Sequence, residues 1–291
     1  MAYKSIYRGD LFQGQVALVT GGGTGIGRCI AHELASLGAT VVVAGRRPEP
    51  LDETVAEVIE DGGLAHAVAL DIRDEEQVKA AVQGIVDRHG RLDMLVNNAG
   101  GQFVSGAEHM RAKGWRAVID TNLNGTFWVT QAAFHAWMGA NGGAIVNIVA
   151  DMWNGFPGMS HTGAARAAVV NLTKTLAIEW AQHGIRVNAV APGVILSSGM
   201  KNYPEFVLEV AIKTAKRNPS ARLGTESEVS AAVLYLLGPA ATFTTGETLR
   251  VDGAASLSKA PLLPLAEHTR LPPFNGFHRP TDLPDSLASE G

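Results

Sequence analysis

The stretch Val16-Ala-Leu-Val-Thr-Gly-Gly-Gly-Thr-Gly-Ile-Gly27 decides the fold of this chain. A continuous apolar run over residues 16–20 stops at the glycines, and apolar residues at helical spacing follow as far as Gly38. An unbroken apolar strand is covered on both faces, and glycine readily ends a helix. Glycines also let the backbone turn sharply toward a pyrophosphate, which the free N–H groups of a helix N-terminus attract. A dinucleotide site is therefore predicted, and the flanking strand and helix disfavour an ordinary glycine-rich turn.

The glycine loop and the next strand end predict which cofactor binds. The spacing G-x-x-x-G-x-G, in place of G-x-G-x-x-G, indicates a subclass of dinucleotide folds. An acidic residue after the second strand would hold the ribose of NAD, but this chain has Gly45-Arg46-Arg47 there. Two guanidiniums favour the 2′-phosphate of NADP(H), with solvated surface arginines as the alternative, above all for Arg47. The expected cofactor contacts in these segments are Gly21, Gly23, Thr24, Gly25, Ile26, Gly27, Arg46 and Arg47, with Asp71 and Ile72 flanking the adenine.

The rest of the chain alternates strand and helix. Strands are expected at residues 16–20, 40–44, 66–70, 94–96, 144–149 and 186–190. Helices are expected at residues 28–37, 51–60, 75–89 and 164–183, with one long helix between residues 96 and 144. Repeated βαβ units predict an α/β fold: a single doubly wound parallel sheet, Rossmann-like, with helices on both faces.

The domain organisation follows from where the composition changes. We expect residues 1–257 to form one NADP-binding Rossmann-like reductase domain that includes the substrate site, and residues 258–291 to form a Pro-rich C-terminal arm. The prolines exclude a regular helix or central strand in the arm. Between disorder and a surface arm we favour the arm, because its apolar side chains need cover. These side chains are Leu262, Leu263, Leu265, Phe274 and Phe277.

Bulk composition excludes several classes of function. The chain is 46% apolar and 18% charged, with a net charge of −4, so neither nucleic acid nor an anionic membrane is an expected partner. Residues 1–15 lack the apolar core of a signal peptide, and no apolar run reaches the roughly 20 residues of a membrane span. Cys29 is the only cysteine, which excludes an internal disulfide and suits a reducing compartment. The histidines show no metal-ligand spacing, so no metal is expected.

Three further motifs, in order and in context, resemble the short-chain dehydrogenase/reductase family. They are Asn97-Asn98-Ala99-Gly100, Asn122 within residues 120–125, and Ala191-Pro192-Gly193-Val194-Ile195. The resemblance runs from about Gln13 to Asp252. It implies that Asn122 belongs to the catalytic group. The residues that it places against the nicotinamide cofactor are Asn98, Ala99, Gly100, Arg166, Pro192, Gly193 and Ile195.

The same resemblance brings out a departure at the catalytic positions. Enzymes of this family reduce carbonyls with a Ser, a Tyr and a Lys four residues after the Tyr. Alignment of Arg166-Ala-Ala-Val169 with the family's Lys-Ala-Ala-Val puts Arg166 at the lysine, Thr162 at the tyrosine and Val149 at the serine. A threonine hydroxyl is far less acidic than a phenol, whose pKa is about 10, so Thr162 cannot replace the acid. Arg166 can still bond the ribose through its donors.

A narrower resemblance covers residues 100–103, 113–115, 121–127, 155–157 and 161–166. These runs are similar to peroxisomal trans-2-enoyl-CoA reductases, and the related 2,4-dienoyl-CoA reductases also lack the tyrosine. The resemblance implies NADPH-dependent reduction of the C=C bond of a 2-enoyl thioester, with an acyl-CoA-type substrate. The chain also looks like bacterial enzymes of citronellol oxidation, so an alcohol or aldehyde oxidoreductase acting on citronellol-like or 3-oxoacyl substrates stays open. An inactive NADP-binding protein is a third hypothesis.

The chemistry supports reduction of the double bond. Ketone reduction leaves an alkoxide that needs a strong acid, whereas enoyl-thioester reduction leaves an enolate that hydrogen bonds can hold. We expect Asp151 to orient a water, or else to be a loop or helix-cap carboxylate. His161 is expected either to contact the substrate or to pack in the structure. The acyl pocket is expected to include Gln102, Phe103, Trp153 and Phe156, although an apolar lid would show the same residues.

Assembly and location complete the expectations. Residues 125–138 and 166–180 form helices that are apolar around most of their circumference, which calls for cover on every side. In the family these helices join subunits, so a homotetramer or homodimer is expected, with burial inside one chain as the alternative. The chain ends in Ser289-Glu290-Gly291, without a peroxisomal signal, and a cytoplasmic location is expected.

Overall fold

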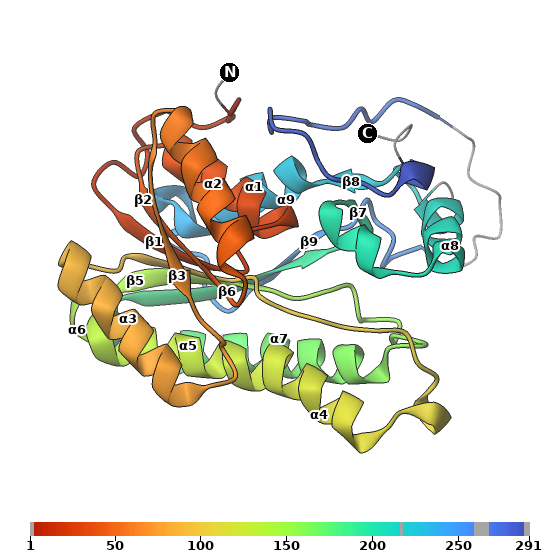
Figure 1. Ribbon diagram of the computed structural model, residues 1–291, viewed down its shortest axis with the longest axis horizontal. Helices are drawn as coiled ribbons and strands as arrows, with labels where there is room; N and C mark the ends of the chain where they lie inside the picture. The colour runs from red at the N-terminus through yellow and green to blue at the C-terminus, as the bar shows by residue number, and fades with distance from the viewer. Residues whose placement is uncertain (1–2, 216–217, 259–267, 288–291) are drawn as a thin grey trace.

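A seven-stranded parallel sheet forms the centre of the molecule in a computed structural model, which describes residues 3–215, 218–258 and 268–287. The strand order is β3-β2-β1-β4-β5-β6-β9 (Figure 1). The strands are β1 (Val16–Thr20), β2 (Thr40–Gly45), β3 (Leu64–Ala69), β4 (Met94–Asn97), β5 (Gly143–Ile148), β6 (Ile185–Pro192) and β9 (Thr248–Val251). The predicted doubly wound α/β sheet is confirmed.

Helices cover both faces of the sheet. Above it in Figure 1 lie α1 (Gly25–Ser36), α2 (Pro48–Glu60) and α9 (Glu226–Leu237). Below it lie α3 (Glu75–His89), α5 (Gly125–Ala133) and α7 (Ser160–Glu179). Each face has its own apolar cluster, because the strand side chains alternate between the two layers. Buried residues on both sides explain why the strands read as continuous apolar runs.

The direction in which the sheet is built reverses at β1. This strand pairs with β2 on one side and with β4 on the other, both in parallel register. The connections that leave β1 and β4 therefore run to opposite faces, and a crevice opens at the carboxyl ends between them. Ligands of open α/β sheets bind at this point.

The long helix expected between β4 and β5 is interrupted. It comprises α4 (Ala112–Ile119), a π-helical turn η2 (Asp120–Asn124), α5, a second π-helical turn η3 (Phe134–Met138) and α6 (Gly139–Asn141), preceded by the 3-10 turn η1 (Ala107–His109). A π-helical turn inserts an extra residue into the helix and shifts the side chains that follow it. The first of these turns carries Asn122.

A smaller unit lies beside the carboxyl edge of the sheet. It contains the two-stranded pair β7 (Ile195–Leu196) and β8 (Gly224–Thr225), the 3-10 turn η5 (Ser198–Asn202) and α8 (Glu205–Ala215). Its apolar cluster includes Met200, Leu208, Ala215 and Leu223. We call this unit the lid. No element was predicted from the sequence for the lid, for α9 or for β9.

The described part of the C-terminal segment, residues 268–287, runs along the surface next to α9, α1 and the end of α2 (Figure 1). Gly276 and Phe277 donate their backbone N–H groups to Ser227 Oγ, and Lys4 donates its N–H to Gly276 O. Leu287, in the 3-10 turn η7 (Asp285–Leu287), is fully buried in the lid cluster. Leu262, Leu263 and Leu265, for which cover was expected, lie outside the described residues. Among the described helices, none combines the length and apolarity needed to cross a membrane.

Candidate active site

The glycine loop between β1 and α1 is built by close backbone packing. Gly21 and Gly25 have positive φ angles of 66° and 56°, which glycine adopts without strain. A Cβ on Gly27 would lie 2.2 Å from Gly21 O, so the first turn of α1 can approach the strand end only without a side chain there. Asn98, after β4, donates through Nδ2 to Thr20 O at 3.0 Å and to Gly21 O at 3.1 Å. These two hydrogen bonds hold the glycine loop against the end of β4, across the crevice.

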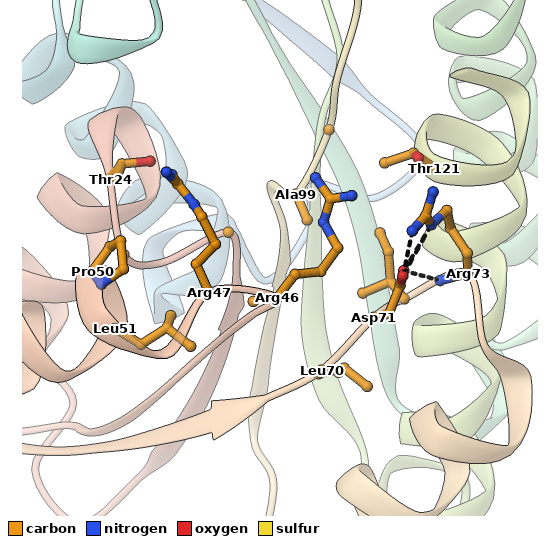
Figure 2. A pocket seen from close by; sticks show the side chains of 15 residues that line it. Thr24, Arg46, Arg47, Pro50, Leu51, Leu70, Asp71, Arg73, Ala99 and Thr121 are labelled. Carbon is orange, nitrogen blue, oxygen red and sulfur yellow. Dashed lines mark hydrogen bonds and ion pairs between the residues drawn. The ribbon is translucent and has the colours of Figure 1, made fainter. Parts of the chain in front are cut away.

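A cleft of about 170 Å³ lies at the carboxyl ends of β2 and β3. The predicted residues that line it are Gly21, Gly23, Thr24, Arg46, Arg47, Asp71, Ile72, Ala99 and Gly100. The Arg47 side chain lies toward Thr24, and that of Arg46 lies between Ala99 and Arg73 (Figure 2). The predicted contacts Ile26 and Gly27 do not line this cleft, because they lie in the first turn of α1.

Arg73 also lines the cleft, and the sequence analysis missed it. Its guanidinium pairs with Asp71 at 2.5 Å, and this bond lowers the pKa of the Asp71 carboxyl (Figure 2). The cleft thus holds three guanidiniums and one carboxylate, a strongly cationic balance. The only indication in the sequence was that Arg73 follows Asp71 by two residues in a loop. Many solvent-exposed loops contain such an acidic–basic pair, so the spacing does not identify a binding residue.

Arg166, Asn122 and Gly100 meet at the next part of the crevice. A Cβ on Gly100 would lie 2.4 Å from Arg166 Nη2 and 2.9 Å from Asn122 Oδ1. Asn122 accepts the N–H of Gly101 at 2.9 Å and donates to its carbonyl at 2.9 Å, which fixes this loop on the π-helical turn. The guanidinium of Arg166 therefore lies directly over the backbone of Gly100.

The buried Arg166 guanidinium has no hydrogen bond or ion pair with any described residue. Only 8% of Arg166 is exposed, and burial lowers its pKa to about 10, so it keeps its charge at neutral pH. A buried, unpaired cation is costly, and a ligand with oxygen acceptors would compensate it. The site is therefore suited to ribose hydroxyls or a substrate oxygen.

Thr162 and His161 form a closed pair at the start of α7. Both are fully buried, and the Thr162 backbone donates to His161 Nδ1 at 2.7 Å. The Thr162 hydroxyl lies 3.2 Å from the same nitrogen. Nδ1 is thus the acceptor nitrogen, which leaves the proton on Nε2, and Nε2 is buried without a partner. Burial lowers the pKa of His161, and a hydrogen bond with the Met159 backbone opposes this only in part, which favours the neutral ring with one N–H donor.

Asp151, in the loop after β5, is a carboxyl group with an unusual environment. Its Oδ1 is buried without a hydrogen bond. Burial raises the pKa of Asp151, the negative charge of Asp252 raises it further, and the Trp153 N–H and Arg250 act in the opposite direction. The Asp252 side chain accepts the backbone N–H groups of Ala254 and Ser256, both at 3.0 Å. Burial and the neighbouring Asp252 charge thus act in the same direction on the pKa of Asp151.

Asp252 follows β9 and was not predicted as part of the site. A Cβ on Gly193 would lie 2.8 Å from Asp252 Cα, so the Pro192–Gly193 turn after β6 packs against it. Ile195 is buried in β7, at the base of the lid. Since β9 itself was not recognised from the sequence, nothing marked the residue after it.

The expected substrate residues lie on two adjoining loops. Ser105 donates its N–H to Gly158 O at 2.7 Å, which joins the loop after β4 to the loop after β5. The Phe103 ring packs edge-on against His161 with centroids 4.5 Å apart. Trp153 packs under the Arg250 guanidinium at 4.0 Å from the ring centroid. Phe156 lies against α7, because a Cβ on Gly163 would lie 2.8 Å from Phe156 Cβ.

Gln102 reaches across to the lid. Its amide nitrogen, Nε2, donates a hydrogen bond to the hydroxyl of Tyr203. Tyr203 was not predicted from the sequence as a site residue. Tyr3 and Tyr7 are engaged near the N-terminus, with Cys29 and with Ala231 O. Tyr203 is thus the tyrosine that the described structure places against a predicted site residue.

Comparison with known proteins identifies the class. The short chain dehydrogenase family model matches residues 15–206, and the chain belongs to this family. A probable 2,4-dienoyl-CoA reductase of Bacillus subtilis is 37% identical over 85% of this chain and 98% of its own length. The 3-oxoacyl-[acyl-carrier-protein] reductase FabG of Thermotoga maritima is 37% identical over 83% of this chain and 97% of its own.

A solved structure extends the comparison. The citronellol catabolism dehydrogenase AtuB of Pseudomonas aeruginosa is 49% identical, with a TM-score of 0.79 over 87% of this chain and 100% of its own. Membership of the family makes the protein an oxidoreductase that uses a nicotinamide cofactor, NAD or NADP. The reactions named for these relatives differ, so the family alone does not select the bond that is reduced.

Gly100→Ala tests whether the Arg166 guanidinium supports cofactor binding. The new methyl group would displace Arg166 Nη2, and overpacking of this kind costs about 1–3 kcal/mol, or roughly 5- to 150-fold in the Kd of the nicotinamide cofactor. Fluorescence titration with the reduced cofactor measures this Kd. Gly101→Ala is the matched control, because a Cβ there meets nothing within 4 Å. Equal Kd values for the two variants would contradict a role for the contact.

Proposed function

We propose that this protein is an NADP(H)-dependent reductase that acts on the C=C bond of a 2-enoyl thioester, such as an enoyl-CoA. The observation that carries the proposal is the pairing of Thr162 with His161. Four positions before Arg166, the buried Thr162 hydroxyl contacts the His161 imidazole. This position therefore has no side chain acidic enough to protonate an alkoxide. The 2,4-dienoyl-CoA reductase named above supports an acyl-CoA substrate.

The preference for NADP(H) rests on the cationic cleft. No described residue pairs with Arg46 or Arg47, whereas Arg73 is neutralised by Asp71. A 2′-phosphate brings about two negative charges and accepts bidentate bonds from guanidiniums. The ribose of NAD would find no carboxylate at the end of β2, since this position is Gly45-Arg46-Arg47. The other predicted cofactor contacts surround the crevice between this cleft and Arg166.

The reaction needs a hydride, a place for negative charge and a proton. A bound nicotinamide cofactor would supply the hydride for C3 of the substrate. The negative charge that results is delocalised over the thioester as an enolate, and donors near the thioester oxygen stabilise it. In this site the His161 Nε2–H and the Arg166 guanidinium are unpartnered donors. Neither has to give up a proton, so the chemistry at C3 does not depend on a phenol.

Asp151 is proposed as the source of the proton for C2, directly or through one water. Its raised pKa keeps the acid form at a higher pH than for an ordinary carboxyl, and its buried Oδ1 has no competing partner. Proton delivery to the carbon converts the enolate into the saturated thioester. Gln102, Phe103, Trp153 and Phe156 are proposed to contact the acyl thioester, because they lie on the two loops next to His161.

A second function, alcohol or aldehyde oxidoreduction, is favoured by one observation of its own. The Tyr203 hydroxyl contacts Gln102, and it could serve as a phenolic acid from the lid. The similarity to a citronellol catabolism dehydrogenase supports this alternative. The two proposals differ in which side chain carries the proton.

Assembly and location are proposed from an apolar groove and from the state of the cysteine. A groove between η2–α5 and α7 exposes Phe127, Trp128 and Leu172. We infer that a second copy of the chain covers it in a homodimer or homotetramer. The single cysteine, Cys29, is buried and free, which fits a reducing compartment such as the cytoplasm.

Arg46→Ala tests the cofactor preference. Loss of a charged hydrogen bond to the 2′-phosphate costs about 1.5–3 kcal/mol, so KM for NADPH should rise about 10- to 150-fold. KM for NADH should change less than about twofold, because NADH lacks that phosphate. Arg88→Ala, on α3 outside the cleft, is the control. An equal rise in KM for NADPH and NADH would show that Arg46 does not bind the 2′-phosphate.

A substrate panel tests the reaction. NADPH absorbance is followed in parallel with crotonyl-CoA, a longer 2-enoyl-CoA, citronellal and a 3-oxoacyl-CoA. We expect oxidation of NADPH with the enoyl thioesters, because their enolate needs no strong acid. Turnover of the aldehyde alone would overturn the proposal. Tight binding of NADPH without any turnover would instead indicate an inactive binding protein.

Asp151→Asn and Tyr203→Phe identify the proton donor. Removal of a general acid lowers rates by about 10²- to 10⁴-fold, and we expect this for kcat of Asp151→Asn with the enoyl-CoA substrate. Tyr203→Phe should stay within about fivefold of wild type, since it loses one hydrogen bond. The wild-type kcat should fall as pH rises through the raised pKa of Asp151, and this step should vanish in Asp151→Asn. The reverse pattern, with Tyr203→Phe inactive, would support carbonyl chemistry.

A further inference from the structure

Two histidines and an aspartate converge on the side of the molecule away from the arginine cleft. His32 belongs to α1, Asp61 follows α2, and His278 belongs to the C-terminal segment. The His278 Nε2 atom lies 2.8 Å from Asp61 Oδ2, and His32 Nδ1 lies 3.3 Å from the same oxygen. One ligand atom from each residue lies within 4.8 Å of the other two. The side chains of His32 and His278 are only 1% and 7% exposed.

The atoms that face one another in this cluster all have lone pairs. His32 Nε2 lies 3.1 Å from Glu57 Oε2 and donates to it, which leaves Nδ1 without a proton. His278 Nε2 accepts from Arg279 Nε at 3.1 Å, so it is also unprotonated. Asp61 Oδ2 is buried and makes no hydrogen bond, despite the two nitrogens beside it. Three acceptors in contact repel each other unless a proton or a metal cation lies between them.

The surrounding charges leave room for that cation. The acidic groups are Glu57, Glu60 and Asp61, and the basic groups are Arg28 and Arg279. Three carboxylates and two guanidiniums leave one negative charge when the histidines are neutral. Burial lowers the pKa of His32, which favours the neutral imidazole that metals bind.

We propose that His32 Nδ1, Asp61 Oδ2 and His278 Nε2 bind a divalent transition-metal ion, with zinc as the best match. Zinc takes imidazole and carboxylate ligands at about 2.0–2.2 Å in tetrahedral geometry, which sets neighbouring ligand atoms about 3.3 Å apart. The separations of 2.8 and 3.3 Å at Asp61 Oδ2 are close to this value, and the two histidine nitrogens lie within 4.8 Å of each other. A water completes the coordination.

The second layer of the cluster also has the pattern of a metal site. A metal-bound imidazole usually donates its other N–H to a carboxylate, which orients the ring. Glu57 plays this part for His32, and it is itself held by Arg28 through bonds of 2.8 and 2.5 Å. Arg279 keeps its Nη2 bonds to Asp61 Oδ1 and Glu60, both at 2.8 Å, when its Nε releases His278.

The proposed ion would fasten the C-terminal segment to the dinucleotide-binding layer. His278 follows Phe277, whose ring packs against His32 at 5.1 Å and under Arg28 at 5.1 Å. Further along, Asp282 pairs with Lys201 of the lid, and Leu287 is buried in the lid cluster. The metal would therefore hold in place a segment that spans α1, α2 and the lid. This role is structural and does not depend on which bond the enzyme reduces.

Metal content and affinity test the proposal directly. The full chain is treated with EDTA, equilibrated with Zn²⁺ alone and analysed by elemental mass spectrometry and calorimetry. We expect about one Zn²⁺ per chain, a rise in Tm that EDTA reverses, and visible d–d absorption when Co²⁺ replaces Zn²⁺. His278→Ala should weaken Zn²⁺ binding by more than about 100-fold, because second-layer changes alone cost 10- to 100-fold.

His109→Ala is the matched control, since this exposed histidine lies outside the cluster. His278→Ala changes only the surface segment, and unchanged NADPH binding would verify that the variant folds. Uptake far below one Zn²⁺ per chain would overturn the proposal, as would equal uptake by His278→Ala and wild type.

Discussion

The close approach of the first turn of α1 to the end of β1 is the constraint on which the rest of the structure depends. Gly27 and Gly21 touch with no space for a side chain, and Asn98 bonds the same backbone from the neighbouring strand. This contact brings the helix N-terminus to the point where the sheet reverses direction. The cationic cleft then lies on one side of the loop, and Arg166 with Asn122 on the other.

Under the proposed function, the site separates the charges that bind the cofactor from the group that supplies the proton. Arginines gather at the ends of β2 and β3, where solvent and a phosphate can reach them. Asp151 instead lies against Asp252, and burial together with that charge favours its protonated form. His161 and Arg166 offer donors that are not bonded to any described residue. In the proposed reaction the negative charge is spread over a thioester, so a phenol at position 162 is unnecessary, and the threonine and the surviving donors are compatible with the proposal.

Much of this was predictable because the signals are local. Strands such as β1 and helices such as α3 follow from apolar periodicity and end glycines, and α3 was predicted at the residues observed. The arginine pair after β2 was predicted from its place in a βα unit. The lid, α9 and β9 were not predicted, because their sequence patterns are short or apolar on every side. Asp252 and Tyr203 were therefore not predicted either, since a residue can be assigned to a site only when the element that carries it is known.

The sequence by itself determined the class of fold, the position of the dinucleotide loop and the absence of a phenol four residues before Arg166. Only the tertiary structure decided which distant side chains meet. It set Asp252 beside Asp151, Tyr203 against Gln102, and His278 against Asp61. The physical reason is that these contacts join segments far apart in the chain. Their geometry depends on how the sheet, the lid and the C-terminal segment pack, which no local pattern records.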